Sequence, residues 1–133
     1  MQPVYVWHMY SPGATASEWQ LNGPASWSHL GDNSEFALTI GTSISGVSVS
    51  YGACLSANFL LMTVNFFGSG IEAPCTLFGI VAAPGKPGIQ VIDCSDGRAF
   101  PPGGAGIVNS DGTCDCDVPV DETTWGGIKA LYQ

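Results

Sequence analysis

The stretch NFLLMTVNFF, residues 58–67, decides which fold class this 133-residue chain can adopt. Leu60, Met62, Val64 and Phe66 form one apolar face and alternate with a second face of mixed polarity, which is the period of a β-strand. A helix is the rival interpretation, because the run is almost continuously apolar. Its β-branched and aromatic residues favour a central strand. We therefore predict a strand here.

Strand patterns of the same kind recur along most of the chain and are separated by glycine- and proline-rich turn signals. About eight or nine short strands at such a spacing predict an all-β fold, a two-layer antiparallel β-sandwich of immunoglobulin-like or jelly-roll type. The further predicted strands are VYVWHMY (4–10), FALTI (36–40), ISGVSVSY (44–51), CTLFGIVA (75–82), IQVIDC (89–94), AGIVN (105–109) and TCDCDV (113–118), and the predicted turns are SPG (11–13), APGKPG (83–88), SDG (95–97) and SDG (110–112).

The remaining segments are less regular. ATASEWQL, residues 14–21, predicts either one helical turn or a strand that begins near Ser17, and residues 22–33 read as a loop. Composition changes again after residue 118, where a double glycine precedes IKALY. We therefore predict a β-sandwich domain over residues 1–118 and a C-terminal tail over residues 119–133.

Charge excludes two classes of partner. The chain has three basic residues, Lys86, Arg98 and Lys129, and a net charge of −8. Three scattered cations cannot form the basic face that nucleic acids require, nor an attraction to anionic lipid headgroups. No charged residue lies between Glu35 and Glu72, but this segment is rich in glycine, serine and threonine, so it does not predict a membrane span.

Several features predict an extracellular protein. The chain has five cysteines and many glycine, serine and threonine residues, which is typical of an oxidising compartment. The N-terminal stretch MQPVYVWHMY lacks the basic start and the apolar core of a signal peptide. We therefore expect a secreted protein whose signal peptide is not included in this sequence.

The cysteines predict disulfides. Cys75 begins one predicted strand and Cys94 ends the next, so antiparallel pairing of these two strands would place them side by side. The spacing therefore favours Cys75–Cys94, and then Cys54 with either Cys114 or Cys116. An odd count leaves one cysteine unpaired within the chain.

The stretch NSDGTCDCD, residues 109–117, also invites a metal or redox interpretation. Zinc sites use Cys-x2–4-Cys pairs or Cys/His clusters, calcium loops are longer than this tight turn, and redox motifs are Cys-x-x-Cys. We therefore predict neither a metal nor a cofactor. The stretch is interpreted as a hairpin whose returning strand is held to the sheet by disulfides.

No catalytic residues are predicted, because the sequence contains no nucleophile-plus-base motif and its acidic residues gather in turns and in the tail. Three residues near the predicted 22–33 loop are candidates for binding a ligand: Trp19, Trp27 and His29. Exposed tryptophans beside polar side chains suit stacking on sugar rings. The competing interpretation is that both tryptophans fill the ends of the sandwich.

Five stretches carry a resemblance to a known group: residues 4–19, 41–75, 89–94, 109–116 and 118–132. The chain resembles uncharacterised secreted β-sandwich proteins of uncultured bacteria, which are seen mainly in metagenomes. The resemblance implies a signal peptide and export. TTWGGIKALY, residues 123–132, is similar to the C-terminal tails of many such proteins, but Gln133 stands where a basic residue usually closes the motif. This departure weakens a sorting role for the tail.

The same resemblance implies an additional N-terminal strand with a sixth cysteine, which this chain lacks. An unpaired cysteine and an unpaired sheet edge would then remain, and such an edge is a template for another chain. Our first expectation is a non-catalytic extracellular structural module that self-associates through an exposed edge strand into a homo-oligomer or filament. The alternative is a carbohydrate-binding module in which the exposed tryptophans bind glycans.

Overall fold

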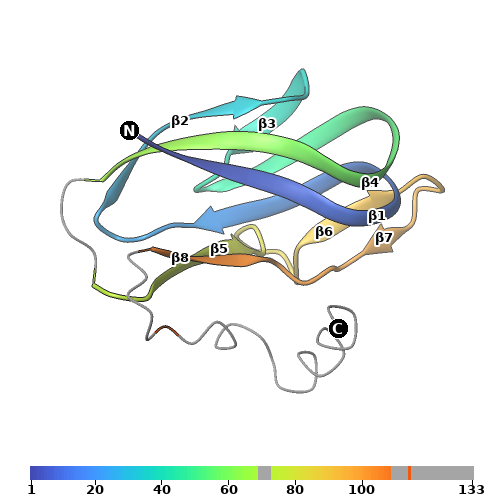
Figure 1. The fold of residues 1–133 in the computed structure, drawn as a ribbon. Coiled ribbons are helices and arrows are strands. Elements are labelled where there is room, and N and C mark those ends of the chain that lie inside the picture. The colour runs from blue at the N-terminus through green and yellow to red at the C-terminus, as the bar shows by residue number, and fades with distance from the viewer. Residues whose placement is uncertain (69–72, 109–113, 115–133) are drawn as a thin grey trace.

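The computed structural model describes residues 1–68, 73–108 and 114, and over this part the chain is all-β and antiparallel, as predicted (Figure 1). No helix occurs among these residues. The eight strands are β1 (Gln2–Asn22), β2 (Trp27–Ser34), β3 (Leu38–Thr42), β4 (Gly46–Gly68), β5 (Thr76–Val81), β6 (Gln90–Asp93), β7 (Arg98–Ala99) and β8 (Ala105–Val108).

Two long strands, β1 and β4, organise the sheet. They pair from Gln2 opposite Phe66 to Trp19 opposite Val47, with several register shifts between residues 6 and 16 of β1. β2 and β3 both pair with β4, one along each half of that strand. Residues 47–50 and 62–66 of β4 therefore have strand partners on both sides, in agreement with the central strand predicted for the apolar run at residues 58–67.

The C-terminal half of β1 carries the rest of the sheet. β6 pairs with residues 14–18 and β5 with residues 20–22, both antiparallel. β7 pairs with β6, and β8 pairs with β5, again antiparallel. Figure 1 shows β5 and β8 beneath the ribbon of β1 and β4. This arrangement is compatible with the predicted two-layer sandwich.

The core lies on one face of the sheet that β1 and β4 organise. Val47, Val49 and Tyr51 are buried, and so are Met62, Val64 and Phe66, on the faces that the alternation predicted. The prediction for Leu60 is wrong: Leu60 is only partly buried and Leu61 is buried in its place, because the register of β4 against β1 shifts at this point. Burial of these aliphatic and aromatic side chains is the main source of stability. The buried hydrophobic residues that form the core cluster are Val6, Ala14, Trp19, Leu21, Val47, Val49, Tyr51, Leu61, Met62, Val64 and Phe66.

Two of the predicted boundaries are wrong. The SPG turn at residues 11–13 is absent, because β1 continues through it with irregular register. Residues 22–33, predicted to be a loop, contain most of β2. In both places the backbone hydrogen bonds to β4 override a local turn preference.

The predicted disulfide pairing is also wrong. The disulfides are Cys54–Cys94 and Cys75–Cys114, with Cα–Cα distances of 5.6 and 5.3 Å. The prediction assumed that β5 and β6 pair with each other. Instead they lie end to end along the same edge of β1, so that their outer ends, Cys75 and Cys94, are far apart. Of residues 109–117, only Cys114 lies within the described part of the chain.

Gly13 makes the first disulfide possible. Ala14 is paired with Leu55 on one side and with Asp93 on the other, so Cys54 and Cys94 lie on the two strands that flank β1. The disulfide therefore crosses β1 at its irregular segment. A side chain on Gly13 would start 3.2 Å from Cys94 Sγ and 3.4 Å from Cys54 Sγ, and Gly13 has a φ of 143° that L-residues rarely adopt.

Peptide mapping tests this connectivity. Cleavage before aspartate and after glutamate, without reduction, places each cysteine on its own peptide: residues 36–72, 73–92, 93–95, 111–114 and 115–116. The structure predicts that 36–72 is linked to 93–95, and 73–92 to 111–114. A link between 73–92 and 93–95, detected by mass spectrometry, would instead restore the pairing expected from the sequence.

Candidate functional site

Two of the three predicted ligand-binding residues lie close together, and the third is part of the core. The side chain of Trp19 is only 2% exposed, so the prediction that it binds a ligand is wrong. Trp27 and His29 both pack on Phe66, with ring-centroid distances of 5.5 and 5.9 Å. Trp27 is partly buried and also stacks on Phe78. The set therefore presents no open pair of tryptophans.

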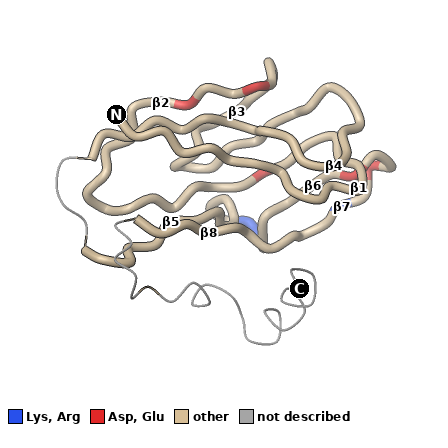
Figure 2. Tube along the Cα trace, in the orientation of Figure 1, with Lys and Arg blue, Asp and Glu red and all other residues tan. Residues whose placement is uncertain are grey.

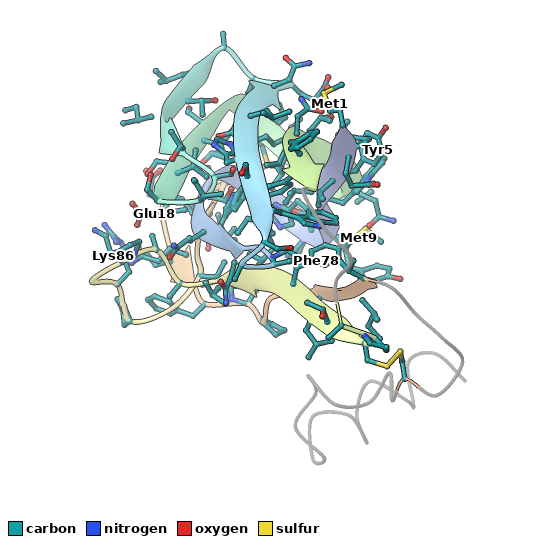
Figure 3. All side chains as sticks on the ribbon, turned by 90° about the vertical axis from the view of Figure 1, so that its left-hand side faces the viewer. Met1, Tyr5, Met9, Glu18, Phe78 and Lys86 are labelled. Atoms are coloured by element: carbon teal, nitrogen blue, oxygen red, sulfur yellow. A yellow bond between two sulfur atoms is a disulfide. The ribbon has the colours of Figure 1, made fainter. Side chains whose placement is uncertain are left out.

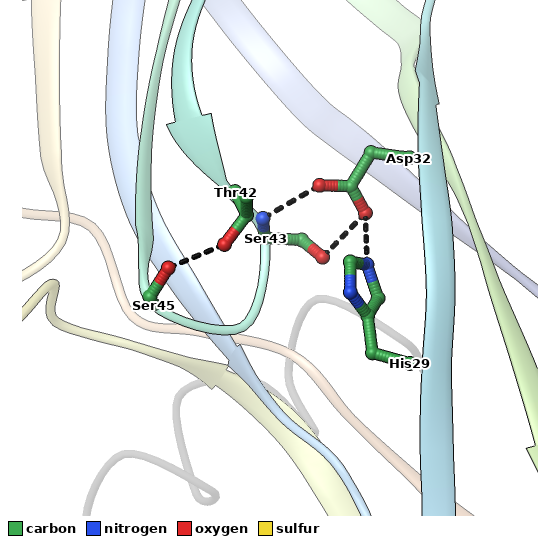
Figure 4. A network of polar contacts seen from close by, with 5 residues as sticks. All are labelled: His29, Asp32, Thr42, Ser43 and Ser45. Atoms are coloured by element: carbon green, nitrogen blue, oxygen red, sulfur yellow. Dashed lines mark hydrogen bonds and ion pairs between the residues drawn. The ribbon is translucent and has the colours of Figure 1, made fainter.

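His29 belongs to a polar network that joins β2 to the turn between β3 and β4 (Figure 4). Its Nε2 lies 2.8 Å from Asp32 Oδ1. Asp32 also accepts hydrogen bonds from the backbone N–H of Ser43, at 2.7 Å, and from the Ser43 hydroxyl, at 2.6 Å. In the same turn the hydroxyls of Thr42 and Ser45 contact each other.

The network contains serine, aspartate and histidine but not the geometry of a nucleophile. In a catalytic triad the histidine lies between the serine and the carboxylate. Here Asp32 lies between the other two, and Ser43 is completely buried. Burial alone would raise the pKa of Asp32, but the hydrogen bonds from Ser43 and His29 outweigh it and hold that pKa below its usual value. The network therefore fixes the turn.

A second histidine lies in an aromatic cluster at the bend of the long strands. His8 Nδ1 is 3.1 Å from the Tyr51 hydroxyl, and the His8 ring packs on Phe59 at 5.0 Å. Tyr51 packs in turn on Phe36 and Phe59. Burial lowers the pKa of His8 and raises the pKa of Tyr51 to about 12. Both groups are therefore neutral at neutral pH.

Acid should destabilise the protein through His8. Because the folded pKa of His8 is lower than the unfolded value, the unfolded chain binds more protons, and stability falls as the pH drops below the unfolded value of about 6.5. Urea unfolding at about pH 8 and about pH 5 measures this loss. His8→Gln, which keeps a polar partner for Tyr51 but cannot take up a proton, should show a smaller loss. An equal loss in both proteins would contradict the assignment.

The N-terminal half of β1 is one of the open edges of the sheet. Residues 2–8 pair with β4 on one side, and no described strand pairs with their other side. A groove of about 700 Å³ runs along this open edge. Its walls include Val4 and Val6 of β1, Phe78 and Ile80 of β5, and Ile107 of β8.

The outer face of this half-strand is unusually apolar. Tyr5, Trp7 and Met9 alternate along β1 and are about half exposed, at 59, 52 and 48%. Tyr5 and Met9 lie on the same side of the molecule in Figure 3. These residues were not among the predicted site residues, although the alternation of VYVWHMY was the signal. It shows two apolar faces where a strand that covers a core needs only one.

Other kinds of site are absent from the described residues. No group of three or more histidine, cysteine, aspartate or glutamate side chains in that part of the chain is placed to hold a metal ion. Nor does it contain a helix with the length and apolarity that a membrane crossing requires. Charged residues are sparse along the whole described trace (Figure 2).

Comparisons of the chain with protein families, with curated proteins and with solved structures found no match. The open edge, the groove and the two disulfides are therefore the features that bear on function.

Proposed function

We propose that the protein is a non-catalytic extracellular structural module that self-associates through the open edge of β1. The observation that carries the proposal is the missing neighbour of residues 2–8, which have strand partners on one side only within the described part of the chain. A strand edge of this kind presents backbone N–H and C=O groups that another chain can pair with.

The groove beside the edge supplies the apolar part of such an interface. Val4 and Phe78, which line it, are only partly buried, and so is Ile80. A strand of a second copy that paired with β1 would cover these side chains and satisfy the edge at the same time. Burial contributes about 25 cal/mol per Å² of apolar surface, which is the main driving force of association.

The exposed side chains of the half-strand, whose residues also line the groove, add apolar area to the interface. Tyr5, Trp7 and Met9 project from the outer face of the same residues that form the edge. Aromatic residues and methionine are enriched in protein interfaces. Charged side chains would oppose association of this face. The β4 residues that pair with Tyr5 and Trp7 are uncharged, namely Thr63 and Leu60.

Cysteine chemistry supports export and a covalent contact. Two disulfides within one small domain are typical of an oxidising compartment. They use four of the five cysteines, so Cys116 has no cysteine left to pair with in its own chain. In an oxidising compartment, a Cys116–Cys116 disulfide would link two copies.

Light scattering after size exclusion tests self-association. Protein made in an oxidising compartment should have a mass that is a multiple of 13.8 kDa. Trp7→Lys, which places a charge on the open half-strand, should shift it towards the monomer. Leu30→Lys, on β2, is the matched control, because Leu30 is equally exposed and lies on a different strand.

Three outcomes would count against this proposal. A monomer at all concentrations would exclude self-association. Dissociation by Leu30→Lys but not by Trp7→Lys would move the interface to β2. An oligomer that is lost on Cys116→Ser but not on Trp7→Lys would show that the disulfide, and not the strand edge, holds the copies together.

A carbohydrate-binding module is the second candidate, on different residues from those first predicted. Tyr5 and Trp7 are exposed and two residues apart on one face, or about 6.6 Å along the strand. Such a pair suits stacking on sugar rings. A glycan array should then give a specific signal that Trp7→Ala removes and Trp27→Ala leaves, whereas an array without signal would exclude this alternative.

A further inference from the structure

A second hollow lies on the other half of β1, away from the open edge. Directly opposed residues of paired strands lie on the same face, so the registers place two rows of side chains across the outer face of the sheet. One row runs Leu38, Ser50, Ala16, Ile92, Arg98, and the next runs Ile40, Ser48, Glu18, Gln90. The middle of both rows consists mainly of small residues, which leaves a hollow of about 320 Å³.

One wall of this hollow is aliphatic and exposed. Leu38 and Ile40, on β3, are 59 and 67% exposed, although the sequence pattern of β3 is that of a half-buried strand. Thr39, which lies between them, points to the opposite face, and its hydroxyl forms hydrogen bonds with the Ser34 hydroxyl and the Phe36 carbonyl. The fold therefore holds two aliphatic side chains on the solvent face, where they contribute little to the core.

The opposite wall is cationic. Two of the three basic residues of the chain, Lys86 and Arg98, line the hollow together with one acidic residue, Glu18. The local balance is +2 − 1 = +1, in a chain whose net charge is −8. Glu18 and Lys86 lie on the side of the molecule opposite Tyr5 and Met9 (Figure 3).

The polar groups of the hollow are only partly engaged with each other. Lys86 Nζ is 3.8 Å from Glu18 Oε1, a distance longer than a hydrogen bond, and both side chains reach solvent. The other oxygen of Glu18 accepts a hydrogen bond from Ser48 at 3.0 Å. Arg98 donates one N–H to Gln90 Oε1, at 2.7 Å, and its guanidinium carries further donors that fit a carboxylate.

We propose that this hollow binds a small carboxylate with an aliphatic chain. The carboxylate would lie between Lys86 and Arg98, and the chain would cross Ala16 and Ser48 towards Ile40. The span from β3 to β6 is three strand spacings, or about 14 Å, part of which the side chains at the two ends fill. A medium-chain carboxylate matches both walls, whereas a sugar lacks an aromatic platform here.

Octanoate is the probe for this site, observed by amide chemical shifts in ¹H–¹⁵N spectra of the full chain. The expected shifts gather on the two rows of residues that cross the hollow. Acetate, which has the charge without the chain, and octylamine, which has the chain with the opposite charge, should both bind more weakly. Equal shifts from all three compounds would overturn the proposal.

Three variants are expected to differ in how they change the affinity for octanoate. Arg98→Gln should weaken octanoate binding by about tenfold, which is typical for loss of a charge-assisted hydrogen bond. Glu18→Gln should strengthen it by roughly threefold, because it removes the competitor for Lys86. Asn22→Asp makes the same change in net charge as Arg98→Gln and is the matched control, with no change expected, because Asn22 is exposed and does not line the hollow. Weaker binding by Glu18→Gln, or an equal effect of Asn22→Asp, would exclude the site.

This inference is independent of self-association. The hollow uses the C-terminal half of β1, and the proposed edge interface uses the N-terminal half. A monomeric protein that binds octanoate would support the hollow and exclude the edge interface. Oligomers that do not bind octanoate would support the edge interface and exclude the hollow.

Discussion

Trp19→Ala is expected to lower the free energy of unfolding by about 3–5 kcal/mol, the range observed for loss of a buried aromatic side chain. Trp19 is nearly fully buried and opposes Val47, in the middle of the core cluster. Its replacement removes apolar burial and leaves a cavity that the two long strands cannot close. Urea unfolding followed by circular dichroism measures the loss without depending on tryptophan fluorescence.

Trp7→Ala is the matched control, because it removes the same side chain from the same strand. Trp7 is half exposed, so the expected change is well below that of Trp19→Ala and about 1 kcal/mol or less. Trp19→Phe, which keeps an aromatic ring, should recover part of the loss if Trp19→Ala proves too unstable to measure. Equal effects of the two alanine variants would contradict the assignment of Trp19 to the core.

Removal of the Cys54–Cys94 disulfide is expected to cost about 3–4 kcal/mol. The disulfide closes a loop with a sequence separation of 40 residues, and chain-entropy arguments give a value of this size for such a loop. Replacement of both cysteines by alanine avoids a free thiol. Urea unfolding under non-reducing conditions, compared with the parent protein, gives the difference.

Cys116→Ala serves as the control for this experiment. It also removes a cysteine, but Cys116 belongs to neither disulfide, so the expected change is within about 0.5 kcal/mol. The Cys75–Cys114 disulfide closes a comparable loop, with a separation of 39 residues, so the Cys75→Ala/Cys114→Ala variant should lose a similar amount of stability. A large loss on Cys116→Ala alone would show that the connectivity is different.

The sequence by itself predicted some local features correctly. The alternation in residues 47–51 and 62–66 identified the faces that the core buries, because a strand places every second side chain on the same side. It failed at Leu60, because the register shift between β1 and β4 at this point buries Leu61 instead. The turn at residues 95–97 likewise joins two paired strands, β6 and β7. Each of these features depends on residues that are neighbours in the chain, so composition and spacing were sufficient.

The candidate sites were predicted much less well. Trp19 and Trp27 have similar sequence surroundings, yet one is in the core and the other is partly exposed at its margin. The apolar half-strand with Tyr5 and Trp7, and the hollow with Lys86 and Arg98, were not predicted. Lys86 and Glu18 are far apart in sequence, and no local pattern indicates that they meet.

The sequence determined that the chain forms antiparallel strands, which faces of residues 47–51 and 62–66 enter the core, and that an odd number of cysteines leaves one without a partner in its own chain. Only the tertiary structure decided which strands are neighbours: β5 and β6 share one edge of β1 instead of pairing with each other. The physical reason is that backbone hydrogen bonds are the same for every pair of strands. The choice of partner, and with it the disulfides, the open edge and the hollow, depends on how the whole set of side chains packs.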